Sequence, residues 1–188
     1  MQTALGITVL ASLAFVGTMF DNFFAFAAQL VVTKREHFPR VSWAQGLGVA
    51  SLVLLAGAIS SVLAPIPLRL VGLLFVAPWA LALYAWRHRD QEPHEQYRRG
   101  TVTTFLVTLA LGGDNLAVWI PLLRAGGIVK GLAICGVFLF WELAFLLTAQ
   151  TLAGRPRVVA WGQRRGPALV PFVYFLLGVL ILFECHTL

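Results

Sequence analysis

Charged residues are scarce in this chain, and most of them are clustered in short segments. Only 12% of the 188 residues are Asp, Glu, Lys or Arg, whereas 59% are hydrophobic and the mean hydropathy is +0.83. A soluble domain carries about twice that charged fraction, roughly 25%. Long apolar runs cross a bilayer as helices, so the sequence predicts an all-α integral membrane protein.

Features that other classes of protein need are also missing. No Gly-rich loop of P-loop spacing is present, so ATP is not expected to drive the protein directly. Cys135 and Cys185 have no metal-ligand spacing and give no disulfide framework. No Lys or Arg precedes Lys34, so the first apolar stretch lacks the basic start of a signal peptide and is interpreted as a retained helix. No nucleophile–base set is recognisable, which argues against an enzyme, and no cofactor is expected.

Six apolar stretches are long enough, or nearly so, to cross the hydrocarbon core, which takes about 20 helical residues. The first is longer than required, so we expect it to tilt or break, and the last is marginal. The six stretches are residues 4–32, 44–64, 68–86, 102–123, 128–152 and 167–183.

The segments between these stretches alternate in charge. All but three of the 14 Lys and Arg residues lie in segments 33–43, 87–101 and 153–166, and the exceptions are Arg69, Arg124 and Lys130. Short basic loops stay in the cytoplasm, so both termini of this multi-pass protein are expected outside the cell (inner) membrane. The net charge of +6 then comes from basic loops that lipid headgroups attract, and a nucleic-acid partner is not expected.

The basic cytoplasmic loop 87–101 divides a single transmembrane domain, residues 1–188, into halves 1–90 and 100–188. Each half contains three stretches, so two similar halves would cross the membrane in opposite directions. The sequence therefore predicts six transmembrane helices arranged as a 3+3 inverted repeat.

Two carboxylates lie near the middle of apolar stretches. Asp21 and Asn22 in the first stretch are echoed by Asp114 and Asn115 in the fourth, 93 residues later. A carboxylate at the bilayer centre costs about 2.5–3.5 kcal/mol on insertion scales, and no Lys, Arg or His lies near the middle of any stretch to pair with it. The missing positive charge is expected to be a transported cation or a proton. The alternative is that both aspartates are protonated and only bond neighbouring helices.

Further oxygen ligands lie close to these pairs. Thr18 is one helical turn before Asp21 on the same face, and an asparagine amide adds a carbonyl. Adjacent glycines Gly112 and Gly113 loosen the fourth stretch, and an interrupted helix exposes backbone carbonyls that can coordinate cations. We therefore predict an ion-binding site of Thr18, Asp21, Asn22, Gly113, Asp114 and Asn115, with Asp21, Asn22, Asp114 and Asn115 as the metal ligands.

Glu142, in the fifth stretch, is a third intramembrane acid without a basic partner. It fits a ligand or proton carrier and fits a helix-bonding role equally well. Burial disfavours the charged form of a carboxyl group, whereas a bound divalent cation favours it, so one set of acids can exchange protons for metal. We predict such an antiporter, with Glu142 assigned to proton coupling.

Two segments resemble the cadmium-resistance transporter family of the lysine-exporter superfamily. They are residues 15–22, FVGTMFDN, and residues 109–122 with the core GGDNLAVWIPL. The resemblance implies export of divalent cations such as cadmium, and it gives functional weight to the six site residues above. Leu111 departs from the family pattern, which usually has Asn there.

The ligand chemistry predicts a divalent cation without naming it. Carboxylate and carbonyl oxygens suit harder ions such as calcium, magnesium and manganese, whereas cadmium is soft. The alternative function is export of a small organic cation, such as a basic amino acid or an amine, with the same carboxylates as counter-ions. The expected partners are the lipid bilayer and the transported cation, and a homo-oligomer is left open.

Overall fold

The structure is a computed structural model that describes residues 4–67, 70, 76–88 and 100–184, and all regular structure in them is helical. The prediction of an all-α protein is confirmed for these residues. The elements are α1 (Ala4–Thr18), α2 (Phe20–Val32), the 3₁₀ turn η1 (Arg35–His37), α3 (Phe38–Val62), α5 (Val76–His88), α6 (Thr101–Leu111), α7 (Gly113–Leu152) and α8 (Pro156–Glu184).

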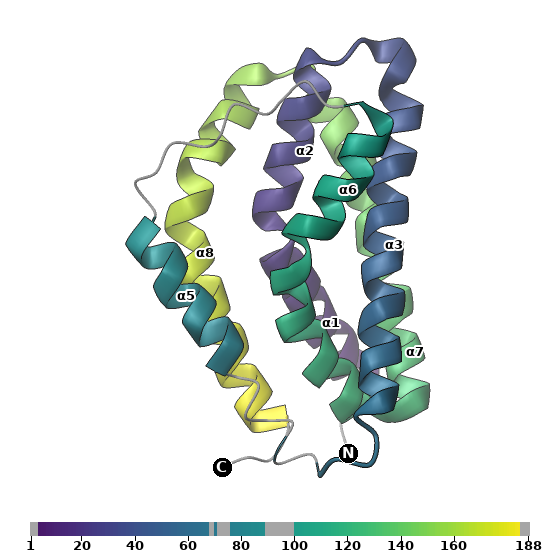
Figure 1. Cartoon of the computed structure of the whole chain (residues 1–188). Helices are drawn as coiled ribbons and strands as arrows, with labels where there is room; N and C mark the ends of the chain where they lie inside the picture. Colours follow the sequence, from purple (N-terminus) through teal and green to yellow (C-terminus); the bar gives the residue numbers. More distant parts are fainter. Residues whose placement is uncertain (1–3, 68–69, 71–75, 89–99, 185–188) are drawn as a thin grey trace.

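The helices form one elongated bundle in which the chain reverses direction repeatedly (Figure 1). The pair α1 and α2 runs toward the upper end of the view, α3 returns, and α5 runs upward again beside α8. The pair α6 and the start of α7 then descends, the rest of α7 ascends, and α8 descends. The start of α1 and the finish of α8 therefore lie at the same end of the bundle.

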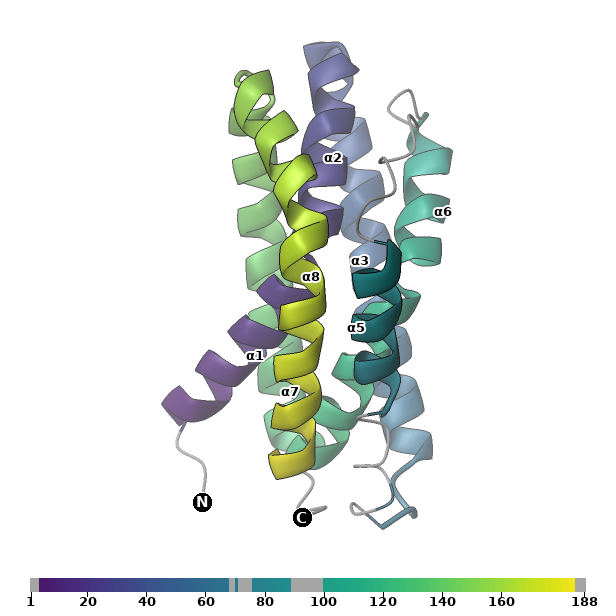
Figure 2. The same cartoon turned by 90° about the vertical axis from the view of Figure 1, so that its left-hand side faces the viewer.

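Two of these paths are interrupted by a break in the helix. The first break is at Met19 (φ −94°, ψ 4°), where the axes on either side differ by 54° and α1 leans away from α2 in Figure 2. The second is at Gly112 (φ −83°, ψ 3°), between α6 and α7. Both expectations are confirmed: the overlong first stretch breaks, and the two adjacent glycines interrupt the fourth.

The long helix α7 is two helices joined at Gly127. This residue has φ 66° and ψ −175°, in a region of backbone space that favours glycine. The turn separates residues 113–126 from residues 128–152, which agrees with the predicted limits of the fifth stretch, whereas helix continues beyond residue 123, the predicted end of the fourth.

Judged by length and hydropathy, two of the described helical segments are able to cross a membrane. They are Arg35–Val62 and Gly113–Leu152, the second of which contains the turn at Gly127. The bent pair Leu5–Thr18 and Asn22–Val32 gives a third if it counts as one span.

Two helices begin earlier than the apolar pattern predicts. α3 starts at Phe38 and α8 at Pro156. The predictions that 33–43 and 153–166 form loops are therefore wrong for 38–43 and 156–166. Each of these helices has a proline in its first turn, where the missing N–H costs nothing. The charged side chains of Arg164 and Arg165 are exposed, which lets the helix continue beyond the apolar stretch.

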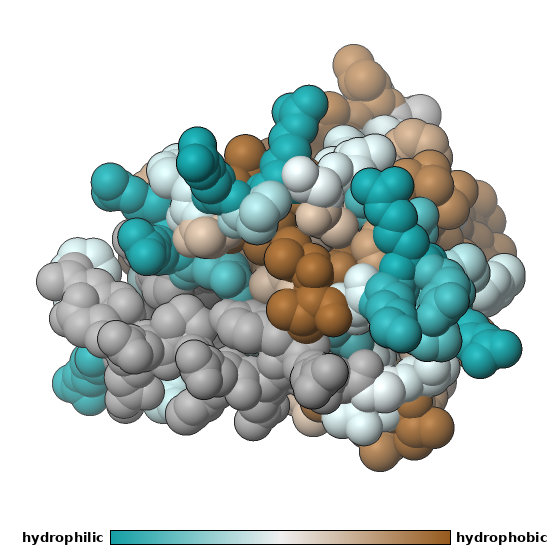
Figure 3. Space-filling view, turned by 90° about the horizontal axis from the view of Figure 1, so that it is seen from above, coloured by the Kyte–Doolittle hydropathy of each residue, from teal (hydrophilic) through white to brown (hydrophobic). Residues whose placement is uncertain are grey.

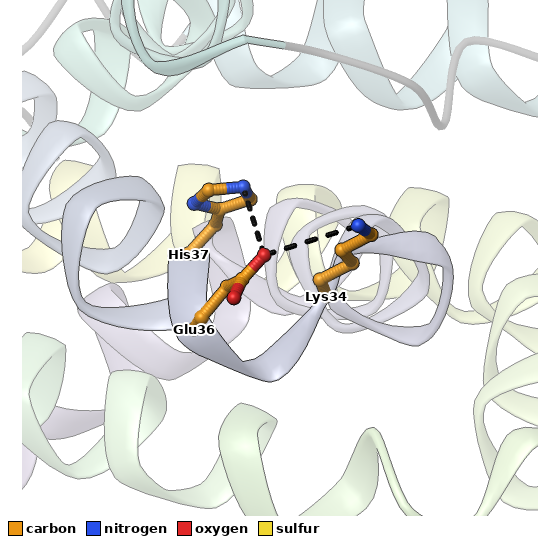
Figure 4. Close-up of polar contacts among 3 residues, drawn as sticks. All are labelled: Lys34, Glu36 and His37. Atoms are coloured by element: carbon orange, nitrogen blue, oxygen red, sulfur yellow. Dashed lines mark ion pairs between the residues drawn. The ribbon is translucent and has the colours of Figure 1, made fainter.

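Basic side chains gather at the end of the bundle where α2 leads into α3 and α7 into α8. Figure 3 looks onto this end and shows hydrophilic side chains around a central apolar group. The carboxylate of Glu36 lies 3.9 Å from Lys34 Nζ and 3.6 Å from His37 Nε2 (Figure 4). All three side chains are exposed, so these contacts contribute little to stability.

Aromatic packing fixes the first break against the second half of the chain. The Phe15 ring lies 5.6 Å from Trp119 and 5.5 Å from Phe138, and the latter two rings are 4.8 Å apart. All three are buried, and they join α1 to both segments of α7. At the other side of the bundle Trp79 of α5 stacks on Phe175 of α8, with ring centroids 5.4 Å apart.

Candidate cation-binding site

The two Asp–Asn pairs begin the helices that follow the two breaks. Asp21 and Asn22 lie in the first turn of α2, and Asp114 and Asn115 lie in the first turn of α7. The first N–H groups of a helix have no intrahelical partner, and the helix dipole stabilises negative charge there. The breaks therefore supply part of the positive potential that no central Lys, Arg or His provides. Only the backbone of Asp21 is described; its side chain lies outside the described part of the chain.

The two asparagines converge on Met19. Asn115 Nδ2 donates to Met19 Sδ at 3.1 Å, and Asn22 Nδ2 approaches the same sulfur at 3.7 Å. All three side chains are buried. Asn22 and Asn115, predicted as ligands from opposite halves of the chain, are thus brought together, and the methionine between them was not predicted.

Thr18, predicted as a residue of the ion-binding site, is buried, and its hydroxyl already forms hydrogen bonds. Its hydroxyl donates to the carbonyl oxygen of Ala14 at 2.9 Å and accepts from Trp119 Nε1 at 3.1 Å. A hydroxyl oxygen has two lone pairs, so one remains for another donor or a cation. The break at Met19 also separates Thr18 from Asp21, which the sequence placed on one continuous face.

Asp114 is held by a partner that sequence reasoning missed. Its Oδ2 accepts a hydrogen bond from Tyr174 Oη of α8, and its Oδ1 accepts from the Asn115 backbone N–H at 2.9 Å. The Tyr174 side chain is buried. The only signal in the sequence was a phenol inside the apolar stretch 167–183.

Of the adjacent glycines, Gly112 is the one that packing requires. A Cβ on Gly112 would meet the Leu52 side chain of α3 and the carbonyl oxygen of Thr108. A Cβ on Gly113, the predicted site residue, would meet nothing within 4 Å. Gly112 therefore lets α3 approach the break, and Gly113 leaves open space beside the first turn of α7.

Glu142 is buried in a different place. It lines a groove of about 460 Å³ between α3 and α7, and neither of its oxygens has a hydrogen-bond partner among the described residues. The polar neighbours Ser42 and Gln150 also line this groove, and they bond each other at 3.1 Å. None of the Asp–Asn residues lines it, so the structure does not bring Glu142 together with them.

A small polar cavity of about 20 Å³ lies between α2, α3 and α6, next to Asn22. Gln29 Nε2 donates to Thr104 Oγ1 at 2.6 Å, and Thr108 Oγ1 donates to Gln45 Oε1 at 2.6 Å. That volume is enough for about one water molecule. Gln29, Gln45, Thr104 and Thr108 were not predicted as site residues, although polar side chains in apolar stretches are a signal that could have found them.

Conventional metal-ligand clusters are absent from the part of the chain that the structure describes, where no group of three or more His, Cys, Asp or Glu could hold an ion. His37 is exposed at the basic end, and Cys135 is half-buried in α7. A cation near the breaks would therefore need amide, hydroxyl, thioether or backbone groups beside the carboxylates.

A family of known proteins matches nearly the whole chain. Residues 15–188 match the family model described as the cadmium resistance transporter (Cad). Neither a curated protein nor a solved structure matches the chain. The matched region contains both breaks, both Asp–Asn pairs and Glu142. With its apolar helices, the chain is a membrane protein that belongs to the cadmium resistance transporter family.

Proposed function

We propose that the protein is a secondary transporter that exports a divalent metal cation, cadmium or a related ion. One observation carries the proposal: the breaks at Met19 and Gly112 are separated by the same 93 residues as the two Asp–Asn pairs. Interrupted helices at the interface between two repeats are where many secondary transporters bind their cargo. Family membership favours a metal, and it gives the organic-cation alternative no support.

The proposed ligands are Asp21, Asn22, Asp114 and Asn115, with Thr18 and Gly113 beside them. The convergence of Asn22 and Asn115 on one atom supports this set, since cargo bound there touches both halves. Asp21→Asn and Asp114→Asn should each abolish transport, although each variant still inserts into the membrane and folds. Transport retained by either variant would place the site elsewhere.

The proposed membrane arrangement is six spans in a 3+3 inverted repeat, with the basic end in the cytoplasm and both termini outside the inner membrane. In support, α1 and α2 run opposite to α6 and the start of α7, and the basic segments that join α2 to α3 and α7 to α8 lie at one end of the bundle (Figure 1). Cysteines introduced at Lys34 and Arg155 should be labelled only from the cytoplasm. Labelling of either one from outside intact cells would contradict this orientation.

Proton exchange is the proposed energy source, with Glu142 as the proton carrier. In support, the Glu142 carboxyl group is buried and has no hydrogen-bond partner among the described residues. Because a neutral carboxyl group is far less costly to bury than an ionised one, this environment favours a bound proton. Glu142→Gln should weaken the dependence of transport on a pH gradient more than it weakens metal binding. Flux in the native protein that ignores an imposed gradient would exclude this coupling.

The decisive test of the function is uptake into inside-out vesicles. Cadmium, zinc, manganese and calcium are assayed beside arginine and a simple amine, with vesicles carrying Asp114→Asn as the matched control. We expect uptake of a divalent metal that the control lacks. Uptake of the organic cations alone would replace the proposed function with its alternative.

A further inference from the structure

The methionine at the first break occupies the position where the two halves of the site meet. Met19 is itself the break residue, and its side chain is 1% exposed. Its sulfur lies 3.1 Å from Asn115 Nδ2 and 3.7 Å from Asn22 Nδ2. A thioether, which is a weak hydrogen-bond acceptor, thus lies between the two amides.

The second observation is a buried oxygen without a donor. Asn115 is fully buried, and its Oδ1 has no hydrogen-bond partner among the residues that the structure describes. A buried acceptor left in this state is unusual, because it loses its bond to water and gains nothing in return. The free carbonyl belongs to the same amide whose nitrogen contacts the Met19 sulfur. If this amide turns, its oxygen comes to lie beside the sulfur without giving up a hydrogen bond, and a metal cation there accepts electron pairs from both atoms.

We propose that Met19 Sδ and Asn115 Oδ1 are direct ligands of the exported cation, and that the thioether selects soft ions over hard ones. The inference rests on the proposed function and adds a specificity-determining atom to it. Thioether sulfur favours soft metals, whereas carboxylate and carbonyl oxygens suit harder ions such as calcium, magnesium and manganese. The four oxygen-bearing ligands attract a divalent cation, and the sulfur discriminates among such cations.

Binding requires only a local change at the two amides. In the structure their N–H groups face the sulfur, so each amide must turn to present its oxygen when a cation lies beside Met19. The terminal torsion of asparagine is broad and roughly two-fold, so this rotation needs no backbone movement. The amides then replace two weak N–H···S contacts with two metal–oxygen contacts.

The opposing explanation is that Met19 only fills space. It belongs to the hydrophobic cluster that contains Phe15 and Trp119, and methionine adapts well to irregular gaps. Leucine serves that purpose with similar volume and no sulfur. Met19→Leu therefore separates packing from coordination.

The experiment measures both binding and transport. Replacing Cys135 and Cys185 by alanine leaves Met1 and Met19 as the sole sulfur-containing residues. In this background, X-ray absorption of bound cadmium should show a sulfur neighbour, and Met19→Leu, which retains Met1, should lose it. Thermal unfolding checks that each variant is folded.

In proteoliposomes, Met19→Leu should raise the KM for cadmium by about tenfold or more. Loss of a residue that only contacts a metal ligand already lowers metal affinity by about tenfold or more, and loss of a direct ligand should cost at least as much. The KM for manganese should change far less, because a hard ion gains little from a thioether. Met19→Cys restores a soft donor and should keep the preference for cadmium. Equal effects on both metals, or a sulfur neighbour that persists in Met19→Leu, would overturn the inference. If the native protein moves no metal, the proposed function fails, and the absorption spectrum still decides whether Met19 binds cadmium.

Discussion

Replacing Gly112 by alanine should destabilise the protein, whereas the same change at Gly113 should not. An added methyl at Gly112 would overlap the Leu52 side chain and lie 2.9 Å from the carbonyl oxygen of Thr108. Leu52 is 2% exposed in the core on α3, so it has little room to move. Extra methyl groups in a well-packed core cost about 1–3 kcal/mol. At Gly113, the first residue of α7, an added methyl would meet nothing within 4 Å beyond its chain neighbours and the backbone of its own helix, so no such cost arises.

The assay is thermal unfolding of the purified variants in one detergent. For a chain of this length, 1 kcal/mol corresponds to about 2–4 °C in Tm. Gly112→Ala should therefore lower Tm by about 2–12 °C, and Gly113→Ala should leave it unchanged. Because the two glycines are adjacent in the same break, general effects of alanine on the helix are matched between them.

A double variant identifies the overlap as the cause. Leu52→Ala creates the space that the new methyl group needs, so the combination with Gly112→Ala should be less destabilised than the sum of the single changes. Strict additivity, or a Gly112→Ala protein as stable as the native one, would refute the packing argument.

Three other changes follow from the contacts around the site. Tyr174→Phe removes the hydroxyl that donates to Asp114. Because a hydrogen bond to a charged group contributes about 1.5–3 kcal/mol, the KM for metal flux in proteoliposomes should rise about tenfold or more. Thr108→Val leaves Gln45 Oε1 without its donor and should cost about 1–3 kcal/mol in thermal unfolding, with Thr108→Ser as the milder control. Arg124→Lys loses the guanidinium that donates to the carbonyl oxygens of Leu63, Ala64 and Ile66. Limited proteolysis should then cut the segment after α3 faster. An unchanged rate of cutting would show that these hydrogen bonds do not hold the segment in place.

The sequence predicted the parts of the site that depend on single helices. The excess length of residues 4–32 predicted a tilt or a break, and the adjacent glycines predicted an interrupted helix, because helix length and backbone freedom are local properties. The limits of 128–152 were also correct, since Gly127 interrupts the apolar run.

The partners of the predicted residues could not be predicted in the same way. Tyr174 meets Asp114 because α8 packs beside the start of α7, and Met19 meets Asn115 because the break redirects the chain. Contacts of this kind depend on which helix faces meet, and no spacing within one stretch encodes them. The early start of α8 was missed for another reason: exposed arginines ended the apolar pattern while the helix continued.

The separation of Glu142 from the Asp–Asn pairs has a kinetic consequence. Glu142 lies on the second segment of α7, and Asn115, which contacts Met19, lies on the first. A proton on Glu142 and a metal beside Met19 would therefore occupy different atoms, so neither would exclude the other directly. A carrier with one shared site alternates between two loaded forms, whereas separate sites permit a ternary complex with both cargoes bound. Strict exchange would then depend on which loaded forms can reorient across the membrane. Any form that reorients with only one cargo would appear as an uncoupled leak of metal or of protons.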